Sequence, residues 1–415
     1  MAQHPFLKSI RPVNLLSFGP NTEEIELRPL NILIGPNGCG KSNLIEIIGL
    51  LSKLPDKNPW SRVSETGGAS EWIWKGKDAD KKGSSITFKA SGQKYPIEMT
   101  SAVIDTDSWV EKTIEYSIVL REQNGSLAVM KELFHELDRF ANDPVQPGWF
   151  DRIESVGQIH SKLLQPDSTD QFLNIPGGVS IFSMPGVANL NWYVNHIQKV
   201  ADDLERFAFY GDWSFSADYA PRNLIAAGQP QDRLTEDASN LAQILARYQS
   251  DHRAVFEQIN ELMRKFYDPV KSVDVRVVGT HLQVAIYEEG GFSTPSYRLS
   301  DGTLRWLALL AILLNPTPAP VTCIDEPELG LHPDMLPTLA DLLVDASTRT
   351  QLIVTTHSDS LIDAFTETPE VVCICEKVEG STVIRRLDQE RLKIWLGDYS
   401  LGKLWASGEI GGNRW

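Results

Sequence analysis

The stretch that decides the fold is Ile32-Leu33-Ile34-Gly35-Pro36-Asn37-Gly38-Cys39-Gly40-Lys41-Ser42. An apolar run, a glycine-rich turn and the start of a helical segment follow one another, which fits the phosphate-loop pattern G-x-x-x-x-G-K-[ST]. Its glycines let backbone N–H groups curl round phosphate oxygens, and the helix start adds its positive dipole end. Lys41 is expected to reach the β- and γ-phosphates, and Ser42 to ligate Mg²⁺. The stretch therefore predicts an ATP site that is formed by Gly35, Asn37, Gly38, Cys39, Gly40, Lys41, Ser42 and Asn43.

Composition sets the outer limits. The 415 residues carry 39 basic and 55 acidic side chains, a formal net charge of −16. So acidic a chain is not a uniformly basic nucleic-acid binder, and any DNA contact must come from a local patch or a partner. The longest apolar run, Trp306 to Leu314, is too short to span a membrane. The first five residues do not resemble a signal peptide, so we predict a cytoplasmic protein.

The four cysteines do not suggest a metal site. Cys373 and Cys375 alternate in an apolar segment and would share one face of a strand. Two thiols without a second pair or nearby histidines fall short of a zinc site. We therefore expect four reduced cysteines in the core.

The remaining pattern predicts an α/β fold with three parts. Residues 1–137 are expected to form a first lobe that holds the phosphate loop and an antiparallel β subdomain, with Asn124-Gly125 as a hairpin turn. Residues 138–270 are expected to be a mainly helical insertion, although 142–190 show no clear period. Residues 271–415 form the expected second lobe and a C-terminal tail. Residues 56–84 are expected to be loop, except for the aromatic insert at 72–74.

A second cluster opens the apolar helix that begins near Leu304. It reads Leu299-Ser300-Asp301-Gly302-Thr303. Ser300 or Asp301 is a good N-cap, and Gly302 permits close approach of an anion to the backbone. By itself this is a weak signal, because many capped helices look alike.

Two later strands end in groups suited to phosphoryl chemistry. The first ends in Asp325-Glu326, where Asp325 is expected to hold the Mg²⁺ shell and Glu326 to orient and deprotonate the attacking water. The second ends in Thr355-Thr356-His357-Ser358, where His357 is placed to bond the γ-phosphate or the water. A lone histidine is more often structural, but this one follows a phosphate loop, a capped helix and an acidic strand end in a fixed order.

That order resembles the ABC-type ATPases, specifically the soluble RecF, SMC and OLD-like branch, and the prokaryotic "AAA family ATPase" proteins within it (AAA_21-like). The clear motif matches lie in residues 6–54 and 236–415. The resemblance implies a P-loop NTPase head with a mixed core sheet, an antiparallel β subdomain and a helical insertion. It also implies a homodimer with two ATP molecules between the heads, in which Ser300, Asp301 and Gly302 of one copy face Lys41 and Ser42 of the other. Higher assembly is possible.

The sequence also departs from these relatives. The middle segment lacks the long coiled coil of SMC-type proteins. We also expect no Toprim nuclease domain of the kind that OLD proteins carry, because the printed sequence continues only briefly after the last motif. The glutamine that usually completes Mg²⁺ coordination is not identified, since Gln93, Gln123 and Gln158 are equal candidates.

These features lead to the hypothesis of an ATPase that regulates a partner effector, nuclease-like and acting in prokaryotic defence against phage or plasmids. Trp395 to Trp415 is a candidate docking surface for it, or else packs back on the head. The first alternative is a RecF-like DNA-binding ATPase of repair or recombination. A transporter subunit is disfavoured by the β-rich first lobe, and a pseudo-ATPase by the intact set of site residues.

Overall fold

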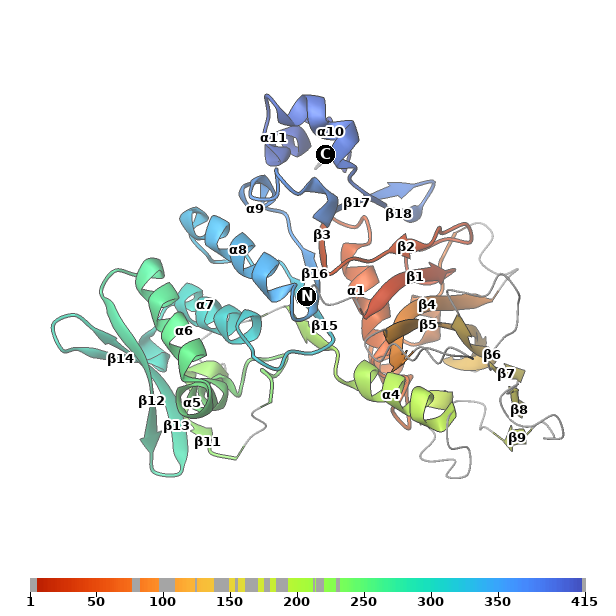
Figure 1. The fold of residues 1–415 in the computed structure, drawn as a ribbon, viewed down its shortest axis with the longest axis horizontal. Helices are drawn as coiled ribbons and strands as arrows, with labels where there is room; N and C mark the ends of the chain where they lie inside the picture. The colour runs from red at the N-terminus through yellow and green to blue at the C-terminus, as the bar shows by residue number, and fades with distance from the viewer. Residues whose placement is uncertain are drawn as a thin grey trace, which may run out of the picture.

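The computed structural model describes residues 6–76, 83–96, 109–123, 125–137, 149–153, 156–160, 171–174, 180–183, 193–211, 213, 220–228 and 232–412. Over these residues the strands form three sheets. Figure 1 shows the phosphate-loop sheet between the other two.

The central sheet is mixed and carries the motifs. Its strands, in spatial order, are β10 (Ala208–Tyr210), β15 (Val321–Asp325), β16 (Gln351–Thr355), β3 (Leu30–Ile34), β17 (Val372–Val378) and β18 (Ser381–Arg386). All pairs are parallel except β17 with β18. Every residue of β3 and β16 is buried, as expected where a parallel sheet is covered on both faces and its strands are almost wholly apolar.

Helices and short 3-10 turns connect or follow the strands of this sheet in the chain. They are α1 (Lys41–Leu51), α7 (Asp301–Leu313), α8 (Leu336–Ala346), α9 (Asp359–Asp363), α10 (Gln389–Leu396) and α11 (Leu401–Ala406), with the 3-10 turns η4 (Ser296–Arg298), η5 (Pro333–Met335) and η6 (Pro369–Val371). The mixed sheet confirms the expected fold class. Cys39, Cys323, Cys373 and Cys375 are free and buried, as predicted.

The second sheet is antiparallel and belongs to the first lobe. Its order is β2 (Ile25–Glu26), β1 (Leu7–Val13), β4 (Ser84–Pro96), β5 (Trp109–Gln123), β6 (Ser126–Leu137), β7 (Trp149–Ile153), β8 (Val156–His160) and β9 (Gln171–Asn174). Residues 149–174 were expected in a mainly helical insertion, but their described parts are strands that extend this sheet (Figure 1). The charged and polar residues of these short strands hide the period-2 pattern that would have identified them.

Short helices interrupt the segment that was expected to be loop. They are α2 (Ser61–Glu65) and α3 (Ala69–Trp72), and the turn η2 (Ile181–Ser183) follows later in the chain. Trp60, Val63, Ala69 and Trp72 are buried in the core cluster that also holds α1. Packing of these apolar side chains, rather than helix propensity, stabilises such short helices.

The third sheet and its helices form the other side of the molecule. The sheet comprises β11 (Ile225–Ala226), β13 (His281–Glu288), β12 (Val270–Val278) and β14 (Ser293–Pro295), and its helices are α5 (Leu241–Asp251) and α6 (Arg253–Phe266), with η3 (Ala220–Arg222). The helix α4 (Tyr193–Glu205) lies instead against the second sheet, where it contacts β4 and η2. The longest described helix is α6, with 14 residues, so the described part of the chain holds no coiled-coil arm. Among these residues, no helix is both long and apolar enough to cross a membrane.

The C-terminal tail packs back on the head. Leu401, Leu404 and Trp405 on α11 are buried, and α11 contacts α9. Trp395 and Tyr399, by contrast, are 47% and 52% exposed. Of the two interpretations of the tail, packing is therefore correct for α11.

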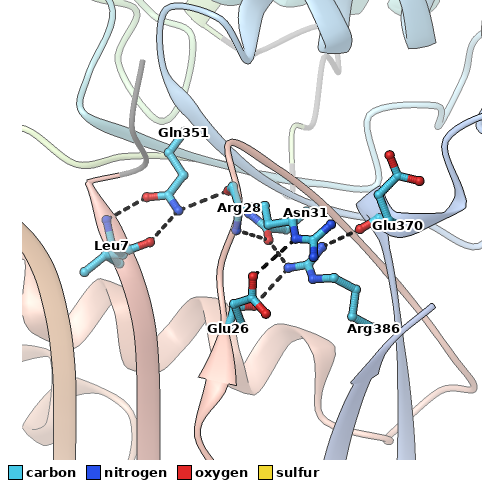
Figure 2. Close-up of polar contacts among 7 residues, drawn as sticks. All are labelled: Leu7, Glu26, Arg28, Asn31, Gln351, Glu370 and Arg386. Carbon is cyan, nitrogen blue, oxygen red and sulfur yellow. Dashed lines mark hydrogen bonds and ion pairs between the residues drawn. The ribbon is translucent and has the colours of Figure 1, made fainter. Parts of the chain in front are cut away.

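A buried polar network joins the sheets at the amino ends of the core strands (Figure 2). The Gln351 side-chain amide accepts from the Leu7 N–H and donates to the Leu7 and Arg28 carbonyl oxygens. Asn31, fully buried, bonds the Arg28 N–H and carbonyl and the Leu352 carbonyl. Arg386 donates to the Asn31 side chain and to the Glu26 and Glu370 carbonyls. These bonds fix the first lobe to β16 and β18.

Candidate nucleotide-binding and catalytic site

The phosphate loop has the predicted conformation between β3 and α1. Gly35, Gly38 and Gly40 all have positive φ, and Gly40 precedes the first residue of α1. At Gly35 a Cβ would lie 2.2 Å from the Cys375 carbonyl oxygen, so only glycine fits between the loop and β17. At Gly38 a Cβ would meet nothing within 4 Å. The phosphate loop is therefore open at Gly38, where we expect a phosphate to bind.

Lys41 is held inside this loop. Its ammonium group donates to the Gly35 carbonyl at 2.9 Å and to the Pro36 carbonyl at 3.2 Å, and the residue is 6% exposed. Ser42 is exposed at the start of α1. The Lys41 ammonium group also lies 4.0 Å from the Cys39 sulfur. A buried ammonium whose partners are all uncharged gains a stronger one when an anionic phosphate binds. The buried ammonium group and the open loop therefore fit a nucleoside triphosphate.

Two residues that the sequence did not single out support the loop from outside. The Thr382 hydroxyl, on β18, donates to the Cys39 carbonyl at 2.6 Å and lies 2.6 Å from the Ser17 hydroxyl. Ser17 in turn accepts from the Asn43 amide at 2.7 Å. Thr382 is 343 positions away from Cys39, and no local pattern marks it.

The Cys39 thiol lies in a polar setting for a core cysteine. A hydrogen bond with Cys375 and the Lys41 charge lower the pKa of the Cys39 thiol, although burial opposes them. The same bond and complete burial raise the pKa of Cys375. Within the described residues no cluster of His, Cys, Asp and Glu suited to a metal ion is present.

A cleft of about 1230 Å³ adjoins the loop. Ser17, Asn43 and Thr382, which support the phosphate loop, also line the cleft, together with Trp74 and Lys377. The cleft thus begins beside the first turn of α1. It offers apolar and polar walls next to the expected triphosphate position.

The acidic strand end and the histidine strand end lie side by side. Asp325 pairs with Thr355 in the parallel register of β15 and β16, and β16 lies between β15 and β3. The His357 Nε2 is 3.5 Å from a Glu326 carboxylate oxygen. The Thr355 hydroxyl donates to Asp325. Asp325, Glu326 and His357 are therefore brought together at the carboxyl edge of the sheet, as the sequence predicted.

Glu326 has a strained backbone. Its φ is +45°, in the left-handed region that non-glycine residues seldom adopt. Its N–H donates both to the Thr355 carbonyl and to the Thr355 hydroxyl at 3.1 Å. These bonds hold the strained conformation, and strain of this kind is concentrated at functional sites.

The start of α7 at Ser300 is a well-formed helix cap, but it lies away from the phosphate loop of the same chain. Ser300 caps α7, accepting from the Thr303 N–H at 3.1 Å. Arg222, 8% exposed, donates to the Leu299 carbonyl at 2.6 Å and pairs with the Asp301 carboxylate. In Figure 1, β15 separates α7 from α1. The structure therefore does not bring Ser300, Asp301 and Gly302 to the phosphate loop of their own chain.

Of the glutamine candidates, only the Gln123 side chain is described. It is exposed at the end of β5 and its amide lies 3.8 Å from the Met130 sulfur. The side chains of Gln93 and Gln158 lie outside the described residues.

Comparison with known proteins agrees with this geometry. The family model described as "AAA domain, putative AbiEii toxin, Type IV TA system" (AAA_21) matches residues 30–173 and 185–363. The chain belongs to this family of P-loop ATPases, within the ABC-type group that the fold and motif order define. No curated protein sequence matches the chain.

Solved structures of SMC heads share the fold. One is an SmcHead bound to the C-winged helix domain of ScpA, with 14% identity, a TM-score of 0.51, and coverage of 93% of this chain and 99% of that one. Another is the Pyrococcus furiosus Smc head with an extended coiled coil, bound to the C-terminal domain of ScpA. It has 14% identity, a TM-score of 0.54, and coverage of 95% and 99%. The resemblance to the RecF and SMC branch is thus confirmed at the level of fold.

Proposed function

We propose that this chain is an ATP-hydrolysing ABC-type head that pairs with a second copy around two ATP molecules and thereby controls an effector protein. The observation that carries the proposal is the assembly of Asp325, Glu326 and His357 at the ends of β15 and β16, of which β16 is the direct neighbour of the phosphate-loop strand β3. Bound Mg²⁺, held by Ser42 and Asp325, would neutralise charge on the phosphate oxygens.

The chain's own residues would divide the work of hydrolysis. Lys41 exchanges its bonds to the Gly35 and Pro36 carbonyls for phosphate oxygens. Glu326 accepts a proton from the attacking water while that oxygen bonds to the γ-phosphorus, and His357, 3.5 Å from Glu326, orients the water or the γ-phosphate. The leaving group is ADP. The cleft beside Asn43 would receive the nucleoside.

The position of α7 supports a split site. Ser300 and the first N–H groups of α7 form a capped helix start that lies apart from the phosphate loop of its own chain. A second copy, turned to face the first, would place them against the γ-phosphate, where the helix dipole favours negative charge. ATP then stabilises the closed pair, and hydrolysis removes the bridging charge.

The effector is proposed by family description alone. The family is described as a putative AbiEii toxin of a type IV TA system, which supports a role in defence against phage or plasmids. We propose a nuclease-like partner in trans. Trp395 and Tyr399, beside the buried α11, are exposed aromatic side chains of the tail that such a partner could contact.

The test is the mass in solution of purified Glu326→Gln, with and without Mg-ATP. A doubling with ATP supports the split site, and Lys41→Ala should abolish the doubling because the phosphates lose their point cation. Ser300→Arg should also abolish it while leaving nucleotide binding to the monomer intact. An unchanged mass with full ATP binding would contradict the pairing.

Adding a short DNA duplex at low and moderate salt distinguishes the proposed function from a RecF-like DNA-binding ATPase. Salt-sensitive stimulation of hydrolysis by DNA would favour a RecF-like DNA-binding ATPase. With a net charge of −16, we expect DNA to change neither mass nor rate.

A further inference from the structure

Glu328 ties the two catalytic strand ends together. One oxygen of its carboxylate accepts from the Thr356 hydroxyl at 2.5 Å and from the His357 N–H at 3.0 Å. Both donors belong to the segment that follows β16, whereas Glu328 follows β15. The Thr356 hydroxyl also accepts from the Ser358 N–H at 3.0 Å. A single carboxylate oxygen therefore fixes the backbone from which the His357 ring projects.

The same carboxylate is set in a largely dehydrated place. Its other oxygen is buried and has no hydrogen-bond partner among the described residues. Burial raises the pKa of Glu328, and the nearby Glu326 charge raises it further. The charged and titratable groups around it are Glu326 on its own loop, His357 after β16, and Arg305 on α7. Burying a carboxylate with one oxygen unpaired costs free energy, so a functional role would explain why Glu328 is buried here.

The loop that carries Glu328 is contacted on two sides. A Cβ at Gly302, in the first turn of α7, would lie 2.6 Å from the Gly330 carbonyl oxygen. On the opposite side, the Glu326 N–H is bonded to Thr355. The loop from Glu326 to Gly330 is thus held between α7 and the end of β16. Glu328 lies at the centre of this loop. Because its carboxylate accepts from the His357 N–H, the position of the loop also fixes the position of the His357 backbone.

We propose that Glu328 is a positioning residue for hydrolysis, which anchors the His357 backbone so that the imidazole stays beside Glu326. It acts through His357 and does not itself take the proton from water. The inference rests on the proposed ATPase function. It deepens that function by naming the group that aligns the histidine with the base.

The experiment compares four variants with the wild type. Glu328→Ala removes the acceptor, Thr356→Val removes one of the two donors, and Glu328→Gln keeps an oxygen that can accept both bonds. Glu370→Ala is the matched control, because Glu370 also has a buried carboxylate oxygen without a partner but lies on η6, away from the catalytic strand ends. Each variant is assayed for kcat and KM with Mg-ATP and for thermal unfolding.

A positioning role predicts a loss in kcat without a change in KM. We expect Glu328→Ala to lower kcat about 10- to 100-fold, the size of a misplaced catalytic group, and Thr356→Val to lower it less. Glu328→Gln should recover most of the loss, and Glu370→Ala should match the wild type. If Glu328→Gln is as inactive as Glu326→Gln, Glu328 acts through its charge or proton, and the proposal is wrong.

Hydrogen exchange at the His357 amide, measured without nucleotide, separates this inference from the ATPase proposal. We expect faster exchange in Glu328→Ala, and wild-type exchange in Glu328→Gln and Glu370→Ala. If the wild type hydrolyses no ATP but exchange changes as expected, the proposed function fails and the anchor stands. Unchanged exchange in Glu328→Ala, or faster exchange with an unchanged kcat in an active enzyme, would overturn the positioning role.

Discussion

The two edges of the central sheet are both polar, yet they are built in opposite ways. At the amino edge, the side-chain amides of Asn31 and Gln351 form hydrogen bonds with buried backbone groups (Figure 2). At the carboxyl edge, Lys41 donates to groups of its own loop, two carbonyls and the Cys39 sulfur, and Glu326 has a positive φ. The amide side chains at the amino edge are paired within the fold, although the Arg386 Nε and one Glu370 carboxylate oxygen have no hydrogen-bond partner among the described residues. The carboxyl edge differs in holding a strained backbone beside the ammonium group of the phosphate loop.

The contrast shows how to tell a structural polar cluster from a functional one. Buried polar groups are normally paired. A strained backbone at a strand end, as at Glu326, is better explained by a ligand or a reaction. Substitutions at the two edges should therefore have separable effects, on turnover at one and on stability at the other.

The largest expected effect is on turnover. Glu326→Gln keeps the size of the side chain but cannot accept the proton from water, so kcat should fall by about two to three orders of magnitude. ATP binding should be retained. Phosphate release at saturating Mg-ATP and nucleotide binding measure the two quantities, and Glu367→Gln, at an exposed site, is the control. A wild-type rate would show that Glu326 is not the base.

At the amino edge, Asn31→Ala should reduce stability instead. The change leaves the Arg28 and Leu352 backbone groups without their partner, which should cost about 3 kcal/mol in the free energy of unfolding. Denaturant unfolding measures it, with the exposed Gln389→Ala as control. The folded variant should keep its kcat. A loss of kcat at unchanged stability would contradict the separation of the two edges.

Arg386→Met should have a smaller effect on the same edge. Its guanidinium makes three bonds, but burial lowers the pKa of Arg386, a sign that its charge is desolvated. A methionine removes the bonds and the desolvation cost together. We expect a loss of about 1 kcal/mol in unfolding experiments. A loss as large as that of Asn31→Ala would mean that the charge itself stabilises the network.

The smallest effect concerns pH. Burial raises the pKa of Glu328 above its ordinary 4.5 in the folded state. The unfolded chain therefore loses this proton first, so ionisation opposes folding, and stability should fall as pH rises from the ordinary value through the folded-state value. Glu328→Gln should remove this fall. Unfolding free energies of the two proteins across that range test it, and parallel curves would contradict the raised pKa.

Much of the site was predictable because its chemistry is local. The phosphate loop, the Ser300 cap and the two polar strand ends each depend on neighbours within a few residues, and parallel strands bring their carboxyl ends to one edge. Thus Asp325, Glu326 and His357 could be grouped from the sequence. A cap at the start of α7 was predicted with Ser300 or Asp301 as the candidate, and the structure shows that it is Ser300.

Other features were missed because their pattern is weak or their contacts are distant. The strands in 149–174 carry too little alternation, and packing on β6 decides their state. Thr382 supports Cys39 from 343 positions away. Glu328 was visible beside the acidic strand end, yet its partners Thr356 and His357 come from another strand.

The sequence by itself determined the motifs of this protein: a phosphate loop, an acidic strand end and a histidine, in the order of an ABC-type ATPase. Only the tertiary structure decided which residues hold them in place, from Thr382 behind the loop to Glu328 beneath His357. The reason is physical. Backbone turns and caps follow from neighbouring residues, whereas a buried hydrogen bond between distant strands exists only after the chain has packed.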